Sequence, residues 1–177
     1  MILEELRSYA RRLHHALRDG DTDLLAFVNH RTRTPVGLAE LQRRHVLAAV
    51  ARRLGFRGWS HLTAVLDGRD DDHGRLFVPP LAGGFTNVWT VDHDEATAIR
   101  AANDGYLLPW QRQFVVVGAG FVEDVLGCDP VDPDWERVGF DLARPADPVA
   151  RHRLVAAVMR HRLGEPTGAG CDQVARG

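Results

Sequence analysis

The chain has 177 residues, 45% of them apolar, and 22 basic against 24 acidic side chains give it a formal net charge of −2. All 22 basic residues are arginine, and the absence of lysine excludes Schiff-base chemistry and a nucleotide-binding P-loop. Serine occurs only at Ser8 and Ser60, neither of them in a G-x-S-x-G elbow, so a serine hydrolase is not expected.

The first third of the chain is predicted to be helical. Residues 2–18 place leucine and alanine on one stripe at alternating steps of three and four, which indicates an amphipathic helix. Gly20 ends this stripe, and Gly55 supplies a left-handed stop after a later one. The helices expected in this part of the chain span residues 2–18, 22–29, 37–54 and 58–66, and together they make a four-helix module over 1–66.

The end of this module carries a motif that we can relate to a family. The segment from Val50 to Leu62 reads V-A-R-R-L-G-F-R-G-W-S-H-L, and H-A-L-R-D-G-D stands earlier, from His15 to Asp21. Over about residues 5–66 the chain therefore resembles a small helical module at the head of many bacterial ankyrin-repeat proteins and beside some glyoxalase-related domains. Gly58 stands where that module usually has a capping serine. The resemblance implies a fold but no particular function, and no ankyrin repeat follows.

The same motif has a physical interpretation. Gly55 permits the positive φ that closes one helix, Phe56 packs back over that helix, and Trp59 is the bulky side chain expected to fix the next helix against the others. These apolar residues are therefore expected to belong to the core rather than to a binding site.

The rest of the chain is predicted to form a second module after an acidic connection. Residues 67–84 are rich in aspartate, glycine and proline and read as a linker, with a short strand over 76–78. An α+β module follows over 85–163, and residues 164–177 read as a frayed tail. Its expected elements are a strand at 87–91, a helix at 93–103, a strand or hairpin over 106–117, a helix at 119–126, a loop at 128–133 and a last helix that starts at Asp147 and Pro148. The fold class is therefore α+β and mainly helical, with a short sheet.

Charge is distributed unevenly along the chain. Residues 1–66 hold 11 arginines against 6 acidic residues, and residues 67–177 hold 11 against 18, so the two parts carry +5 and −7. One interpretation is that the halves dock on each other while most charges stay solvated. The other is that the basic half meets an anionic partner, nucleic acid included.

Several segments look like cofactor-binding or metal-binding motifs but lack residues that those motifs require. The strand and G-x-G of residues 114–120 imitate a dinucleotide-binding turn, but Glu123 stands where the third glycine is needed. Pro130 and Pro133 and the lack of a central glycine argue against a calcium loop at 129–136. No histidine pair has a metal-ligand spacing, although His93, His152 and Asp141 remain an alternative site that folding would have to assemble. No cofactor and no metal are expected.

The remaining candidates define the functional hypotheses. The leading one is a non-catalytic binding or regulatory protein with a protein or small-molecule partner. Its candidate ligand-binding residues are aromatic and charged side chains of the second module, which suit a planar or anionic ligand. They are Tyr106, Trp110, Arg112, Trp135 and Asp141.

Two alternatives stay open beside this hypothesis. One is a helix-turn-helix-like protein that binds nucleic acid through Arg52, Arg53, Arg57 and His61. The other is a small enzyme that uses arginine, histidine and aspartate for acid-base work on an anionic substrate.

The expected location is the cytoplasm. The N-terminus has no signal-peptide pattern, no apolar run is long enough to cross a bilayer, and two cysteines, Cys128 and Cys171, are too few for a disulfide framework. We therefore expect no membrane partner, and the oligomeric state is left open.

Overall fold

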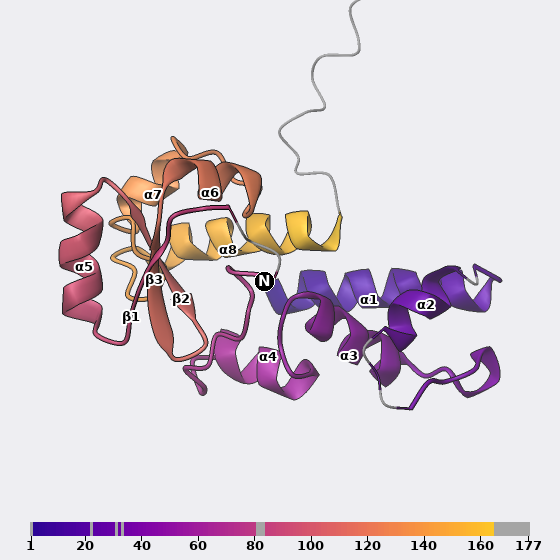
Figure 1. Cartoon of the computed structure of the whole chain (residues 1–177). Helices are drawn as coiled ribbons and strands as arrows, with labels where there is room; N and C mark the ends of the chain where they lie inside the picture. The colour runs from indigo at the N-terminus through magenta and orange to yellow at the C-terminus, as the bar shows by residue number, and fades with distance from the viewer. Residues whose placement is uncertain (1, 22, 31, 33, 81–83, 165–177) are drawn as a thin grey trace, which may run out of the picture. The chain divides into compact units, whose positions relative to one another are not determined.

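The computed structural model describes residues 2–21, 23–30, 32, 34–80 and 84–164. The chain divides into two compact units, Met1–Leu76 and Phe77–Gly177. The first unit is helical, and the second combines helices with a small antiparallel sheet (Figure 1). The fold is therefore α+β and mainly helical, as the sequence predicts. Among the described residues, no helix has the length and apolarity needed to span a membrane.

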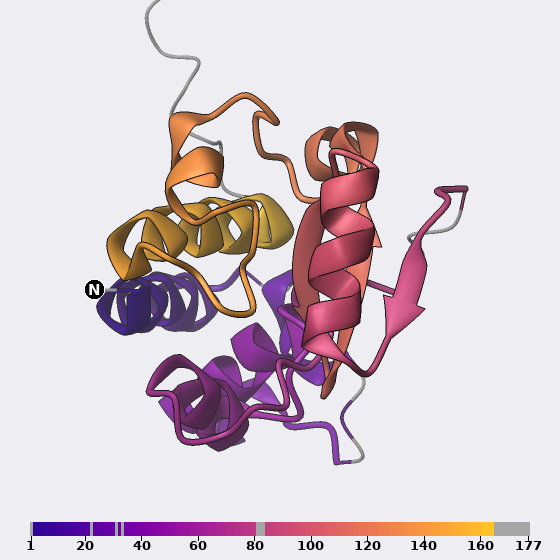
Figure 2. The same ribbon diagram turned by 90° about the vertical axis from the view of Figure 1, so that its left-hand side faces the viewer.

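The helical unit is built around α3 (Arg43–Arg53), which contacts α1 (Ile2–Arg18), α2 (Asp23–Asn29) and α4 (Trp59–Leu66). The figures show α1, α2 and α3 side by side (Figures 1 and 2). The predicted stripe on α1 is buried, because steps of three and four residues return to the same helical face. The buried residues contributed by α1 and α3 are Ile2, Leu6, Ala10, Leu17, Val46, Ala49, Val50 and Ala51.

The third helix begins six residues later than the sequence predicts. A single 3₁₀ turn, η1 (Leu38–Glu40), stands where the prediction has the first turn of an α-helix. Leu41 after it is extended, with ψ 124°, and Leu38 is 43% exposed instead of packed inward. Gly37 offers no capping side chain, and the helix starts only where the backbone N–H of Gln42 donates to Nδ1 of His45.

A crossing of two backbone segments closes the helical unit. Gly55, with φ +90°, lies so near Arg75 that an added Cβ would stand 2.7 Å from the carbonyl carbon of that residue. A Cβ on Gly74 would stand 2.6 Å from the carbonyl oxygen of Gly55, and the Arg75 N–H donates to this oxygen at 3.0 Å. Only glycines allow so close an approach. The acidic segment from residue 67 to 76 is therefore folded onto the helices.

The aromatic anchor of this unit is Phe56 rather than Trp59. Phe56 is 3% exposed, and its ring meets the edge of the His61 ring at a centroid distance of 5.5 Å. Trp59 is only half-buried at the first position of α4. Its place on the opening turn explains the difference, because the buried face of this helix is formed by the later residues His61, Leu62 and Val65.

The second unit is organised by a sheet with strand order β1-β3-β2. The strands β1 (Val88–Thr90), β2 (Tyr106–Trp110) and β3 (Gln113–Val117) pair antiparallel, and β2 and β3 form a hairpin where the sequence predicts either one strand or a hairpin. The helix α5 (His93–Ala102) covers one face (Figure 2), where Ala96 packs with Leu107 and Val116. Tyr106 points to the other face and meets Trp135.

The remaining helices of this unit are α6 (Ala119–Asp124), α7 (Pro133–Arg137) and α8 (Pro148–Leu163). Asp147 caps α8 by accepting from the N–H groups of Val149 and Ala150, as expected for aspartate before proline. Asp132 and Pro133 begin α7 in the same way. Residues 76–78 are buried but form no strand, so that prediction is wrong. The predicted tail lies outside the described residues from position 165 onward.

Candidate functional site

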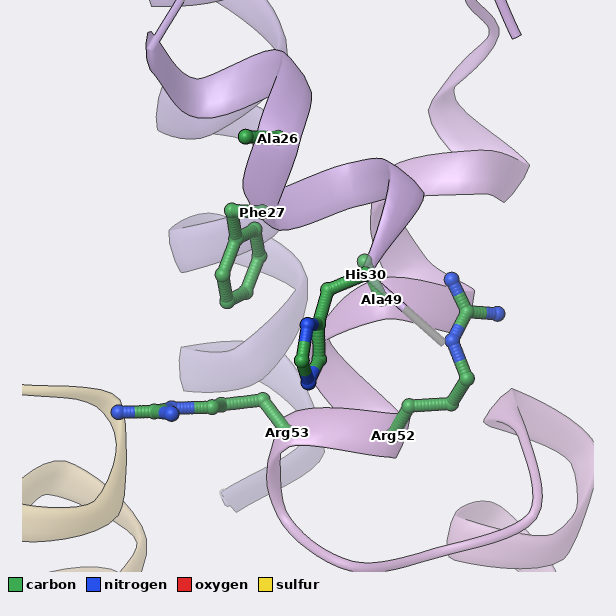
Figure 3. A pocket seen from close by; sticks show the side chains of 6 residues that line it. All are labelled: Ala26, Phe27, His30, Ala49, Arg52 and Arg53. Atoms are coloured by element: carbon green, nitrogen blue, oxygen red, sulfur yellow. The ribbon is translucent and has the colours of Figure 1, made fainter. Parts of the chain in front are cut away.

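The helical unit contains a pocket of about 310 Å³ between the last turns of α2 and α3. Figure 3 shows the His30 ring at its centre, the Phe27 ring above it, and the two arginines reaching to opposite sides. The lining residues are Ala26, Phe27, His30, Ala49, Arg52 and Arg53.

The charge of this pocket is positive. Two guanidinium groups line it, and none of the described residues that line it is acidic. The C-termini of α2 and α3 oppose this charge, because each helix end carries roughly half a negative charge. The two helix ends together offset about one elementary charge, and the titratable side chains that line the pocket are arginine and histidine. An anion is the ligand that this balance favours.

Arg52 has a donor without a partner. Its Nη2 donates to the carbonyl oxygen of Val28 at 3.0 Å, which ties α3 to the end of α2. Its Nε is buried and has no hydrogen-bond partner within the described part of the chain. Burial also lowers the pKa of Arg52, although a guanidinium stays charged at neutral pH. A buried N–H without an acceptor costs free energy, so an acceptor supplied by a ligand would be stabilising.

The residues predicted for nucleic-acid binding fall into two places. Arg52 and Arg53 line the pocket, whereas Arg57 and His61 lie at the start of α4. Nη2 of Arg57 is 3.5 Å from a carboxylate oxygen of Asp70 and 3.6 Å from one of Asp72. The acidic segment after α4 therefore faces the arginine that would contact a phosphate.

His61 is held as an internal hydrogen-bonding group. Its Nδ1 accepts from the backbone N–H of Arg57 at 3.1 Å, and its Nε2 donates to the carbonyl oxygen of Asp72 at 2.8 Å. The residue is 9% exposed. Because one nitrogen accepts and the other donates, the geometry selects the neutral imidazole. Neither nitrogen is left for a partner.

The residues predicted for ligand binding in the second unit do not form one site. Tyr106 and Trp135 are buried in edge-to-face contact, and their polar atoms donate to the carbonyl oxygens of Pro130 and Asp129. Trp110 ends β2 and meets the half-exposed Trp89 across the sheet. Arg112 lies exposed in the turn between β2 and β3.

Asp141 instead meets His93, its partner in the alternative site proposed from the sequence. Residues 140–142 run along the outer edge of β2, where Leu107 donates to Phe140 and accepts from Leu142. This places Asp141 beside the first residue of α5, where Nε2 of His93 donates to Oδ2 of Asp141 at 2.7 Å. Oδ1 of Asp141 accepts from the backbone N–H groups of Ala143 and Arg144. The pair thus fastens α5 to the edge of the sheet.

No metal centre accompanies this pair in the part of the chain that the structure describes, where no three histidine, cysteine, aspartate or glutamate side chains converge. Cys128 is buried, and burial raises its pKa to about 11, so its thiol stays protonated at neutral pH.

The sequence gives little signal for the pocket of the helical unit. His30 reads as a loop residue, Phe27 as a core residue, and the arginines as part of a basic surface. The spacing of Ala49, Arg52 and Arg53 does place them on one face of a helix. Their meeting with Ala26 and His30 depends on how α2 packs against α3. No protein-family model, curated protein or solved structure matches this chain.

Proposed function

We propose that this is a non-catalytic binding protein whose helical unit holds a small anionic ligand in the pocket between α2 and α3. The observation that carries this proposal is the combination of two arginines and a histidine around a cavity with no acidic lining residue, next to an unpartnered Nε of Arg52. His30 adds a donor in either tautomer, because a neutral imidazole always carries one N–H.

The size of the pocket favours a small ligand over a polynucleotide. A nucleic acid needs cations along an extended surface, whereas the arginines of the pocket lie around a cavity of about 310 Å³. The carboxylates of Asp70 and Asp72 face Arg57, and His61 has no nitrogen left for a phosphate. With the acidic segment included, residues 1–76 hold 13 arginines against 10 acidic residues, a surplus of only +3.

The test measures anion binding by the full chain. Inorganic phosphate is titrated by calorimetry at constant ionic strength into the wild type and into Arg53→Gln and His30→Leu. Because a hydrogen bond to a charged group contributes about 1.5–3 kcal/mol, we expect each variant to weaken binding roughly tenfold or more. Arg43→Gln is the matched control, because Arg43 is an exposed arginine at the other end of the same helix.

A sharper variant isolates the unpartnered atom. Arg52→Lys keeps the positive charge and a donor for the Val28 carbonyl but removes the Nε–H. We expect a circular dichroism spectrum like that of the wild type together with weaker phosphate binding. Equal affinities in Arg53→Gln and Arg43→Gln, or no phosphate binding by the wild type, would refute the proposed function.

A further inference from the structure

The sheet of the second unit has two edges, and the described residues cover only one of them. Along β2, the N–H of Leu107 donates to the carbonyl oxygen of Phe140, and the carbonyl oxygen of Leu107 accepts from the N–H of Leu142. Along the outer side of β1, the described part of the chain makes no backbone hydrogen bond, and Figure 2 shows this strand at the outside of the unit. An uncovered edge strand is a template on which another extended chain can pair.

The backbone groups that this edge offers belong to Trp89. In an antiparallel sheet, successive residues of a strand form hydrogen bonds alternately to one side and to the other. Leu107 forms its bonds on the side away from β3, so its neighbour Leu108 bonds to its partner Val115. Because Val115 faces β2, it does not bond to Trp89, its partner on β1. The N–H and C=O of Trp89 therefore point away from the sheet.

The side chains along this edge are apolar and exposed. Trp89 is 44% exposed, and Val88 and Val91 are exposed as well, so three large apolar side chains reach solvent within four residues. Proteins usually prevent pairing at an edge with charged side chains or proline. Residues 84–91 contain neither. The sequence of this strand therefore favours pairing with another chain.

The indole of Trp89 lies on the face of the sheet opposite α5. Val116 packs against α5, so its neighbour Val115, the partner of Trp89, points to the other face. There the Trp89 ring meets the edge of the Trp110 ring at a centroid distance of 4.9 Å. A residue opposite Trp89 on an added strand would have its Cβ about 4.5–5.5 Å from that of Trp89. An arginine or lysine at this position would reach the indole, the best ring for a cation–π contact.

The charge beside the strand also favours a basic partner. Residues 84–95 hold three acidic side chains, Asp92, Asp94 and Glu95, and no basic residue, and the side chain of Asp94 is 97% exposed. Arg112, in the turn between β2 and β3, is the one basic residue in the strands and this turn. The whole unit, residues 77–177, holds 9 arginines against 14 acidic residues. Charge complementarity of this kind steers association and selects partners.

From these observations we infer that β1 is the docking edge for an extended basic segment of another protein, which adds a fourth strand to the sheet. Arginine or lysine alternates with apolar residues in this segment, so that a cation lies against Trp89 and an apolar side chain lies beside Val88. The site belongs to the second unit and is independent of the anion pocket.

The experiment titrates end-blocked heptapeptides into the full chain by calorimetry. The basic probe has the sequence T-R-V-R-V-R-T, and the acidic probe T-E-V-E-V-E-T has the same length and alternation. We expect the basic peptide to bind and the acidic peptide to bind at least roughly tenfold more weakly, because like charges brought together at an interface are strongly unfavourable.

Methylation of the peptide backbone tests the strand pairing itself. N-methyl groups on the three arginines of the basic peptide remove the N–H groups that would bond to Trp89, so we expect binding to be lost. N-methyl groups on its two valines face away from β1 and form the matched control, which should keep its affinity. In the wild-type protein, hydrogen exchange at the Trp89 N–H is expected to slow when the unmethylated basic peptide binds.

Two variants test the side chains that select the partner. Trp89→Leu is expected to weaken binding of the basic peptide roughly twofold to fivefold, the range that an exposed cation–π contact supplies. Trp59→Leu, at a half-buried tryptophan of the helical unit, is its control. Asp94→Asn is expected to weaken binding and to reduce its dependence on salt, and Glu136→Gln, at an exposed carboxylate of α7, is the control for charge.

Several outcomes would overturn this inference. Failure of the basic peptide to bind, or equal affinities of the basic and acidic peptides, would contradict a basic partner. Retained binding after methylation of the arginines would contradict strand pairing, and equal affinities of Trp89→Leu and the wild type would contradict the cation–π contact. If ultracentrifugation shows a dimer that Trp89→Asp dissociates, the edge is occupied by a second copy and the inference fails. None of these results bears on phosphate binding by the helical unit.

Discussion

His61, His93 and Asp134 each make a side-chain hydrogen bond to a residue far away in the sequence, so their neighbours along the chain do not predict these contacts. His61 and His93 each donate Nε2–H to an oxygen contributed by a distant residue, the Asp72 carbonyl in one case and the Asp141 carboxylate in the other. Asp134 opens a short helix and also receives both the Nε and an Nη of Arg153. Each contact joins residues between 11 and 48 positions apart.

The Asp134–Arg153 pair makes the stability of the second unit depend on pH. The hydrogen bonds from Arg153 hold the pKa of Asp134 below its usual value. A carboxyl whose pKa is lowered on folding stabilises the folded state above its unfolded pKa, and this contribution is lost as the pH falls through the folded pKa. We therefore expect the loss of stability between pH 7 and about pH 3 to be smaller in Asp134→Asn than in the wild type.

Urea unfolding at a series of pH values measures this difference. Glu136→Gln is the control, since it removes an exposed carboxylate from the same helix. If Asp134→Asn loses as much stability in acid as the wild type, the ion pair does not contribute to the pH dependence.

At the scale of elements, periodicity predicts a helix better than it predicts where the helix begins. The stripe over 2–18 gives α1 with the expected bounds. The third helix starts late because Gly37 has no side chain to accept the first backbone donors. The first N–H groups of α4 also lack a side-chain cap, because this helix begins after Gly58.

The missing cap of α4 predicts a stabilising substitution. Gly58 has an extended backbone, with φ 171°, and an added Cβ would meet no atom within 4 Å. Gly58→Ser would supply an acceptor for the first N–H groups of the helix and reduce the entropy of the unfolded chain. We expect a gain of about 0.5–1 kcal/mol in the free energy of unfolding.

Thermal and urea unfolding of Gly58→Ser and Gly58→Ala separate the two causes. Alanine reduces the unfolded-state entropy without supplying a cap, so serine should stabilise more than alanine does. Equal effects of the two substitutions would show that capping contributes nothing at this position.

At the scale of the whole molecule, the boundary between the units follows backbone contacts rather than composition. Residues 67–76 are acidic and rich in aspartate and glycine, as a linker would be, yet they contribute the carbonyl that His61 binds and the N–H that Gly55 accepts. Their carboxylates also lower the positive charge of the helical unit. Because the division between residues 76 and 77 assigns this acidic segment to the helical unit, that unit is expected to be more stable and less positively charged than residues 1–66 alone.

Two fragments test this boundary. We expect residues 1–76 to give a helical circular dichroism spectrum and a cooperative thermal transition. Residues 1–66 should be less stable, because they lack the acceptor of the hydrogen bond that His61 donates to Asp72 and the donor of the one that Arg75 makes to Gly55. Losing two such bonds costs about 1–3 kcal/mol. Equal melting temperatures would contradict this account.

The sequence by itself determined the α+β class, the amphipathic helices and the aspartate cap of α8, because these depend on side chains within a few residues of one another. Only the tertiary structure decided that Ala26, His30 and Arg52 line one pocket and that His93 meets Asp141. The physical reason is that these contacts depend on the angle and offset at which two elements pack, and that geometry is set by the side chains of both elements together.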